Sequence, residues 1–147
     1  MYLYIDTTEK DSFAVAWLSK DKVLKKKAVK SERKHSEKLL KSIAQMLNSV
    51  QAALKDIEAI VVVKGPGAFT SLRIGVSVAN ALAYGLKIPA LGIRESERPY
   101  GRESVSRIAK KLDNQINKKK PKIQVVKPEY GRPPHITPKK KKEAVIG

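Results

Sequence analysis

The chain has 147 residues, a formal net charge of +17 and 41% hydrophobic residues, which is enough for one domain with a modest core. It contains no cysteine and only two histidines. The composition therefore excludes disulfides and thiolate chemistry, and it argues against a histidine-built metal centre. No apolar run approaches the roughly 18 residues of a membrane span, and the start MYLYIDTT includes an acid, so we expect a cytoplasmic protein with no membrane segment.

The first half of the chain predicts three strands and a helix. Residues 2–6, 13–19 and 23–30 are rich in β-branched and aromatic or alternating residues and are separated by short polar turns, which predicts an antiparallel meander. From residue 36 the apolar residues recur at helical spacing. This spacing predicts an amphipathic helix over residues 36–50.

The next elements are a buried strand, a second helix and a short strand, at residues 57–65, 68–84 and 87–93. The order β-β-β-α-β-α-β is that of the ribonuclease H-like half of the actin-like fold. It predicts an α/β protein with a mixed sheet, in which three antiparallel strands are followed by two parallel strands with crossover helices. We assign residues 1–95 to this domain, 96–117 to a helical linker and 118–147 to a basic, Pro-rich, flexible tail. The PEY segment at residues 128–130 either shares this flexibility or, as an exception, docks back on the sheet.

Charge is concentrated towards the end of the chain. Residues 1–100 carry 17 basic and 10 acidic side chains, whereas residues 101–147 carry 14 basic and 4 acidic ones. The tail either keeps the protein in solution or contacts an anionic polymer such as RNA. In the second case the candidate RNA contacts are Lys139, Lys140, Lys141 and Lys142.

The stretch VVVKGPGAFTSLRIG joins a strand to a helix through a glycine turn, which is also the arrangement of a phosphate-binding loop. However, Ser71 stands where a P-loop needs its lysine, and Thr70 stands where the dinucleotide fingerprint needs its third glycine. Both standard loops are therefore excluded. The turn is either a tight corner or a weaker anion site at the helix start.

The second helix has almost no polar face. Gly75, Ala79 and Ala83 recur every four residues and form a stripe of small side chains. Such a helix is either buried all round within the domain or shared between the domain and another protein chain. In so small a domain we favour the shared helix.

Three segments together resemble the bacterial TsaB (YeaZ) family, whose members are Gcp-like proteins with an actin-like ATPase fold. These segments are IDTT, KHSEKLL and KGPGAFTSLRIGVSVANALAYG. Ala68 and Ser71 depart from the family's turn pattern, and KPEYGRPPHI is similar to a segment near the family's C-terminus. The family carries a second lobe between these matches, so the chain looks shortened by internal deletion. The matching turn residues are Gly65, Pro66, Gly67, Phe69, Thr70 and Arg73.

The resemblance implies a non-catalytic scaffold in the synthesis of N6-threonylcarbamoyladenosine at tRNA position 37 (t6A37), with no cofactor and no catalytic residue of its own. It implies pairing with a TsaD-like catalytic subunit, which a TsaE-like ATPase joins. Further candidate partners are tRNA, through the basic tail, and a second copy of the chain when the protein is isolated. The alternative is an RNA-binding accessory protein that acts through the basic tail. The implied interface residues are His35, Leu39, Leu40, Ile43, Leu47, Leu72, Gly75, Val76, Ala79 and Ala83.

Asp6 ends the first strand, where actin-like ATPases keep a carboxylate for metal and phosphate. Thr7 and Thr8 follow it, so the three residues form either a vestigial nucleotide site or only an inherited turn. A histidine metal pair at the first helix is excluded, because Leu39 stands four residues after His35.

Overall fold

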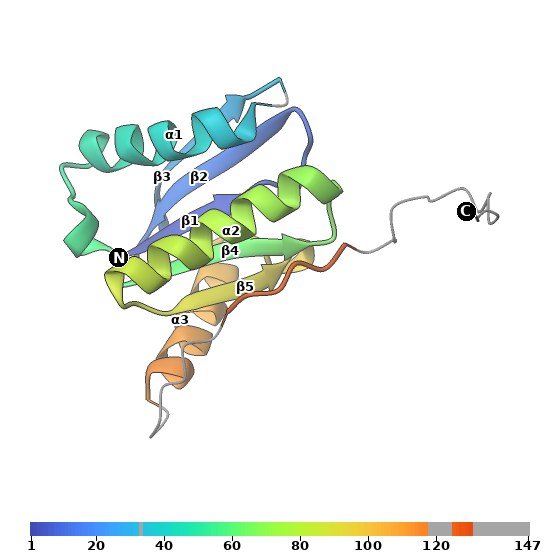
Figure 1. Ribbon diagram of the computed structural model, residues 1–147. Coiled ribbons are helices and arrows are strands. Elements are labelled where there is room, and N and C mark those ends of the chain that lie inside the picture. The colour runs from blue at the N-terminus through green and yellow to red at the C-terminus, as the bar shows by residue number, and fades with distance from the viewer. Residues whose placement is uncertain (33, 118–124, 131–147) are drawn as a thin grey trace.

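The structure, a computed structural model, describes residues 1–32, 34–117 and 125–130. Its centre is a five-stranded mixed sheet with helices on both faces (Figure 1). The strands are β1 (Tyr2–Asp6), β2 (Ser12–Leu18), β3 (Val23–Lys30), β4 (Ala59–Gly65) and β5 (Ala90–Arg94). The α-helices are α1 (His35–Ser49), α2 (Phe69–Leu86) and α3 (Arg102–Ile116), and two short 3-10 turns lie at Leu54–Asp56 and Glu95–Glu97.

The strand order is β3-β2-β1-β4-β5. Strands β1, β2 and β3 pair antiparallel, while β4 is parallel to β1 and β5 is parallel to β4. The predicted mixed sheet is therefore confirmed, and α1 and α2 are part of the crossovers that parallel neighbours require. The last strand begins later than expected, because α2 continues to Leu86 and ends in a left-handed Lys87 with φ of 57°.

Helices α1 and α2 cover one face of the sheet. Their buried side chains join residues of the central strands in one hydrophobic cluster, with Leu39 and Met46 from α1 and Val76 and Ala79 from α2. Strand β4 is buried along nearly its whole length, as expected for a strand that is covered on both faces. The layer of the two helices over the sheet is visible in Figure 1.

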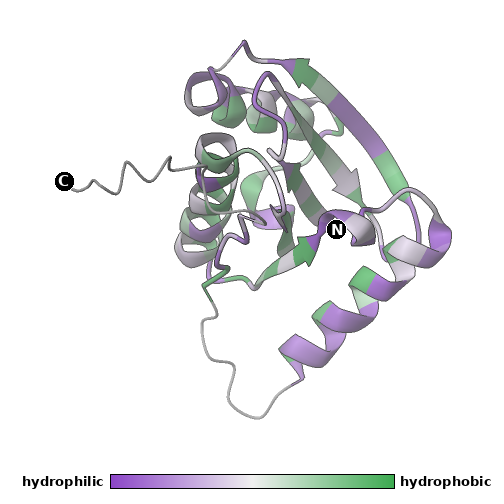
Figure 2. Ribbon diagram, turned by 90° about the vertical axis from the view of Figure 1, so that its right-hand side faces the viewer, coloured by the Kyte–Doolittle hydropathy of each residue, from purple (hydrophilic) through white to green (hydrophobic). Residues whose placement is uncertain are grey.

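Helix α3 covers the other face of the sheet. Val105, Ile108, Ala109 and Leu112 are buried at helical spacing, and the last three pack in a second cluster beside Tyr2, Tyr4 and residues of β4. The outward side of α3 is hydrophilic (Figure 2). The helix that we assigned to a linker is thus the second covering layer of the domain.

Strand β3 forms one edge of the sheet and carries a run of lysines at its centre (Figure 2). Lys25 and Lys26 are exposed, and Lys27 donates to Gln45 Oε1 of α1 at 2.5 Å. At the opposite edge, residues 125–130 of the assigned tail lie along α2 and β5 (Figure 1). The predicted RNA contacts at residues 139–142 lie outside the described residues.

Candidate functional site

The carboxylate of Asp6 at the end of β1 is held by the protein's own donors. Its Oδ1 accepts from the backbone N–H of Thr8 at 3.1 Å and from the Thr8 hydroxyl at 2.7 Å. Its Oδ2 accepts from Arg98 Nε at 2.9 Å, and Arg98 Nη2 donates to Thr8 Oγ1 at 2.7 Å. The side chains of Asp6 and Arg98 are only 13% and 20% exposed, so this ion pair is largely shielded from water.

The electrostatics around Asp6 reflect this pairing. Burial raises the pKa of Tyr4 far above its usual value, and the nearby Asp6, which accepts the Tyr4 hydroxyl at 3.2 Å, raises it further. Burial alone would lower the pKa of Arg98, but Asp6 together with Tyr100 and Tyr4 outweighs that effect and raises it. A metal ion at Asp6 would therefore have to displace a bound guanidinium. In the described part of the chain, no three His, Asp or Glu side chains gather as a metal site.

Thr7 does not face the same side as Asp6. It is fully buried, and its hydroxyl has no hydrogen-bond partner among the described residues. A Cβ added to Gly75 of α2 would lie 2.0 Å from Thr7 Oγ1. Gly75 therefore permits α2 to pass directly over the end of β1, and of the predicted nucleotide residues only Asp6 and Thr8 come together.

The glycine turn is filled by neighbouring protein atoms. Gly65 has φ of +134°, and a Cβ there would lie 1.9 Å from the carbonyl oxygen of Glu129. A Cβ on Gly67 would lie 2.8 Å from Thr8 Cα, and the N–H of Ala68 already donates to the Thr8 carbonyl at 2.8 Å. The geometry favours the tight corner, in which both glycines are required by close approach of other backbone.

The predicted interface residues mostly face inward, which corrects their assignment. The small stripe of α2 points at the sheet, because small side chains are what lets the helix approach β1 and β4 closely. His35 fastens the start of α1 through hydrogen bonds of Nδ1 with Ser31 Oγ at 2.5 Å and of Nε2 with the Glu9 carbonyl at 2.8 Å. Only Leu40 is exposed; the buried residues are His35, Leu39, Ile43, Leu47, Leu72, Gly75, Val76, Ala79 and Ala83.

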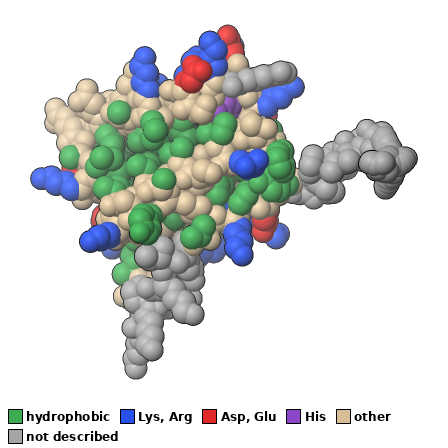
Figure 3. All heavy atoms as spheres, viewed as in Figure 1, with side chains coloured by type: hydrophobic (Ala, Val, Ile, Leu, Met, Phe, Trp, Pro, Cys, Tyr) green, Lys and Arg blue, Asp and Glu red, His purple; other side chains and the backbone are tan. Residues whose placement is uncertain are grey.

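A different set of apolar side chains faces outward from the two helices. Leu40 of α1 is 54% exposed, and Ile74, Val78 and Leu82 form a partly buried stripe at four-residue spacing along α2. Figure 3 shows hydrophobic side chains gathered on this face of the molecule. We call Leu40, Ile74, Val78 and Leu82 the outer helical face. A continuous apolar surface of this kind is typical of a protein interaction site.

The sequence did not identify Arg98 as a site residue. It lies 92 residues from Asp6 along the chain, and no local pattern marks it. Arg73 is exposed and lies over the Phe69 ring, with 5.6 Å between its Cζ and the ring centroid. Phe69 in turn contacts Tyr130 at 4.3 Å between ring centroids. The family turn residues thus connect α2 to the segment at residues 125–130.

The sheet order and its helical layers define a ribonuclease H-like lobe of the actin-like fold, and comparison with known proteins agrees. The family model "TsaD: tRNA N6-adenosine threonylcarbamoyltransferase" matches residues 23–98. YeaZ from Pseudomonas aeruginosa superimposes with a TM-score of 0.58 and 31% identity, over 63% of this chain and 44% of that one. The chain belongs to the family of this model. It is also similar to the TsaB (YeaZ) proteins.

Curated relatives carry both names found in the family. The tRNA threonylcarbamoyladenosine biosynthesis protein TsaB of Bacillus subtilis is 35% identical over 95 residues, which is 65% of this chain and 41% of the relative. A tRNA N6-adenosine threonylcarbamoyltransferase of Syntrophus aciditrophicus is 45% identical over 67 residues, or 46% of this chain and 20% of the relative. The chain thus spans less than half the length of these relatives. No helix in the described residues is long and apolar enough to cross a membrane.

Proposed function

We propose that this protein is a non-catalytic scaffold subunit in t6A37 biosynthesis, which pairs with a TsaD-like catalytic subunit through α1 and α2. Its relatives named TsaB are named for tRNA threonylcarbamoyladenosine biosynthesis. The observation that carries the pairing is the outer helical face, where an apolar stripe remains at the surface after the core is complete.

The outer helical face has enough apolar surface to contribute to pairing. Complete burial of a leucine, isoleucine or valine side chain is worth about 1.5–3 kcal/mol. Because Ile74, Val78 and Leu82 are already partly buried, each contributes about half of this on binding. Together with Leu40, they offset part of the cost of association.

The arrangement at Asp6 supports the non-catalytic part of the proposal. Phosphoryl transfer needs carboxylates that are free to hold a metal ion. Here the carboxylate is neutralised by Arg98, and both of its oxygens already accept hydrogen bonds. The ion pair with Arg98 therefore gives Asp6 a structural role, because it connects the end of β1 to the segment after β5.

The test compares two neighbouring positions on α2. Val78→Arg places a charge on the outer helical face, so the protein should stay folded and lose co-purification with the TsaD-like protein of the same cell. Ala79 is fully buried against the sheet, so Ala79→Arg should instead unfold the domain. Arg107→Glu, on the exposed side of α3, is the control for charge change and should leave pairing intact.

Circular dichroism reports folding, and a t6A assay on the reconstituted pair reports function. Loss of pairing and of modification in Val78→Arg, with unchanged helical content, supports the scaffold proposal. Normal pairing of Val78→Arg shows that the partner binds elsewhere. The TsaE-like ATPase, the homodimer and tRNA contact through residues 139–142 stay predictions.

A further inference from the structure

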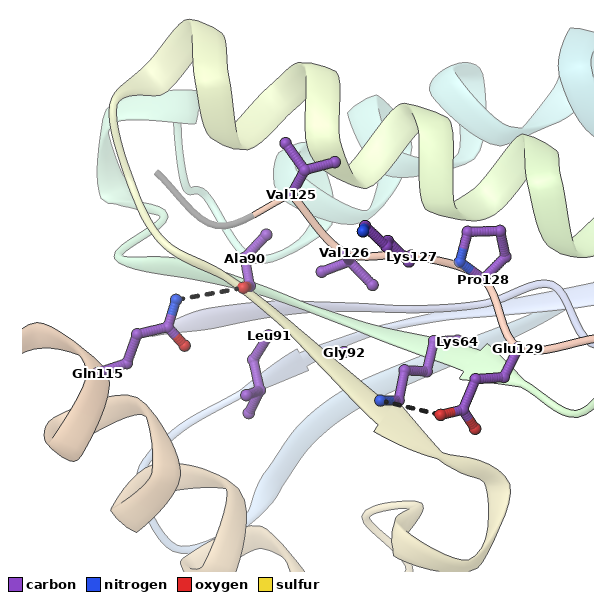
Figure 4. A pocket seen from close by; sticks show the side chains of 10 residues that line it. All are labelled: Lys64, Ala90, Leu91, Gly92, Gln115, Val125, Val126, Lys127, Pro128 and Glu129. Atoms are coloured by element: carbon purple, nitrogen blue, oxygen red, sulfur yellow. Dashed lines mark hydrogen bonds and ion pairs between the residues drawn. The ribbon is translucent and has the colours of Figure 1, made fainter. Parts of the chain in front are cut away.

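Residues 125–130 lie as an extended segment between α2 and β5 (Figure 4). We call the surface that this segment covers the groove. Asn80 of α2 holds it by two hydrogen bonds, one from its Nδ2 to the Val126 carbonyl and one to its Oδ1 from the Val126 N–H, each at 2.9 Å. These bonds contact backbone groups only. Asn80 thus binds the backbone of the peptide as a neighbouring strand would, and these two bonds do not depend on the side chains of the peptide.

The groove also selects the side chain at position 126. Val126 is only 9% exposed and joins the hydrophobic cluster beneath α2. A Cβ added to Gly92 of β5 would lie 2.7 Å from Val126 Cγ1, so a glycine at position 92 leaves the space that this side chain fills. A cavity of about 340 Å³ lies alongside, bounded by β5, Gln115 and the segment itself. The site therefore accepts a branched apolar residue against β5.

Three residues further along, Glu129 fixes the other end of the peptide. Its N–H donates to the Lys64 carbonyl at 2.7 Å, and its carboxylate lies 3.4 Å from Lys64 Nζ and 3.2 Å from Arg94 Nε. Tyr130 then stacks on Phe69. The groove thus recognises an apolar residue, an acid three positions later and an aromatic ring directly after it.

The contacts that hold the segment are weak individually. The side chains of Arg94 and Glu129 are 62% and 38% exposed, and exposed ion pairs stabilise little. Val126 is the one residue of the segment that is buried. A short peptide held in this way dissociates readily, and its rebinding depends on the effective concentration of the segment.

We propose that the groove formed by Asn80, Gly92, Lys64 and Arg94 is a reversible peptide-binding site, and that it binds residues 125–130 of a second copy of the chain when its own segment leaves. Every contact described above lies between the groove and residues 126–130 alone. A second copy presents the same residues, so binding between copies reproduces each hydrogen bond and ion pair. The groove is distinct from the outer helical face and does not depend on the proposed function.

The first experiment uses the full chain with its own segment weakened by Val126→Asp and a labelled peptide of sequence VVKPEY. The peptide should bind this variant at least tenfold more tightly than the wild-type chain, because the wild-type segment competes in the same molecule. Adding Asn80→Leu should abolish binding. Equal binding to both chains, or binding that survives Asn80→Leu, overturns the proposal.

The second experiment uses cysteines, of which the natural chain has none. Gly92→Cys and Val126→Cys are introduced into separate, differently tagged chains, and the mixture is oxidised. The close approach of these positions suits a disulfide, so a mixed-tag disulfide dimer should form and increase with concentration. Gly101→Cys in place of Gly92→Cys is the matched control, since a Cβ there meets nothing within 4 Å.

A chain that carries both Gly92→Cys and Val126→Cys reports closure within one molecule. If this double variant closes quantitatively while the mixed chains give no more dimer than the Gly101→Cys control, the segment does not exchange and the proposal is overturned. Pairing with the TsaD-like protein should be unaffected in either case, which separates failure of the exchange from failure of the scaffold function.

Discussion

Replacing Arg98 by methionine tests whether the ion pair with Asp6 stabilises the end of β1. The change keeps much of the side chain's length but removes the donors to Asp6 Oδ2 and Thr8 Oγ1. Breaking a buried ion pair costs about 3–5 kcal/mol, whereas exposed pairs are worth about 0–1 kcal/mol. Because the two side chains retain 13% and 20% exposure, we expect a loss of about 2–3 kcal/mol.

The loss is measured by urea and thermal unfolding of the full chain. A change of this size lowers the melting temperature by about 5–10 °C for a protein of this length. Asp6→Asn keeps the acceptor at Oδ1 but removes the charge. The loss of stability in the double variant Asp6→Asn, Arg98→Met should be smaller than the sum of the losses in the two single variants. A coupling free energy of about 1–2 kcal/mol is expected from this double-mutant cycle.

Two results would refute the reasoning. A coupling near zero means that the pair does not hold the strand end. A second contrary result is a stable Asp6→Asn variant that pairs with the TsaD-like subunit but supports no t6A formation, because Asp6 would then act in nucleotide or metal chemistry. We expect instead that modification survives Asp6→Asn.

Two further predictions concern close contacts and pH. Gly75→Ala should destabilise the protein by about 1–3 kcal/mol, because the added methyl group meets Thr7 Oγ1. Adding Thr7→Ala should restore only part of this stability, since the Cβ of residue 7 remains 2.9 Å from the added methyl group. Urea unfolding of the single and the double variant measures the difference. Desolvation raises the pKa of Glu129, but Lys64 and Arg94 together outweigh it and lower the pKa below 4.5. The attraction between Glu129 and these two cations is therefore fully present above pH 4.5, and it is lost as the pH falls through the lowered pKa. The protection factor of the Val126 amide, which is its hydrogen-exchange rate relative to the intrinsic rate at the same pH, should therefore fall in acid for the wild type. A Glu129→Gln variant whose protection factor shows the same fall would contradict this assignment.

The sheet could be predicted from local patterns. Residues 60–63 are an unbroken β-branched run, and such a run in a small α/β chain is almost always a central strand. The amphipathic spacing of α1 likewise fixes which side faces the core. These features depend on neighbours within a few positions, which is why the central strand and the first helix agree with expectation.

The orientation of α2 could not be predicted in the same way. A helix that is apolar all round gives no indication of which side meets the sheet, and the small stripe at Gly75, Ala79 and Ala83 fits a partner helix as well as a sheet. The structure shows that the sheet takes this stripe, because Thr7 lies directly beneath Gly75. The bulkier Ile74 and Val78 are left for the surface.

Contacts between distant parts of the chain also escaped prediction. Arg98 reaches Asp6 across 92 positions, and Asn80 of α2 binds the backbone of Val126 across 46 positions. The buried spacing of α3 at Val105, Ile108 and Leu112 was present in the sequence. The charged residues around this spacing resemble those of the tail, so the sequence alone indicates a linker rather than a covering helix.

The lysines of β3 bear on how the protein avoids self-aggregation. An edge strand offers unpaired backbone groups to any other exposed strand, and charged side chains along it oppose such pairing. Lys25, Lys26 and Lys27 place this repulsion at the middle of the exposed edge. Association through sheet edges is thereby penalised, so the apolar outer helical face can stay at the surface without the molecules stacking edge to edge into fibres.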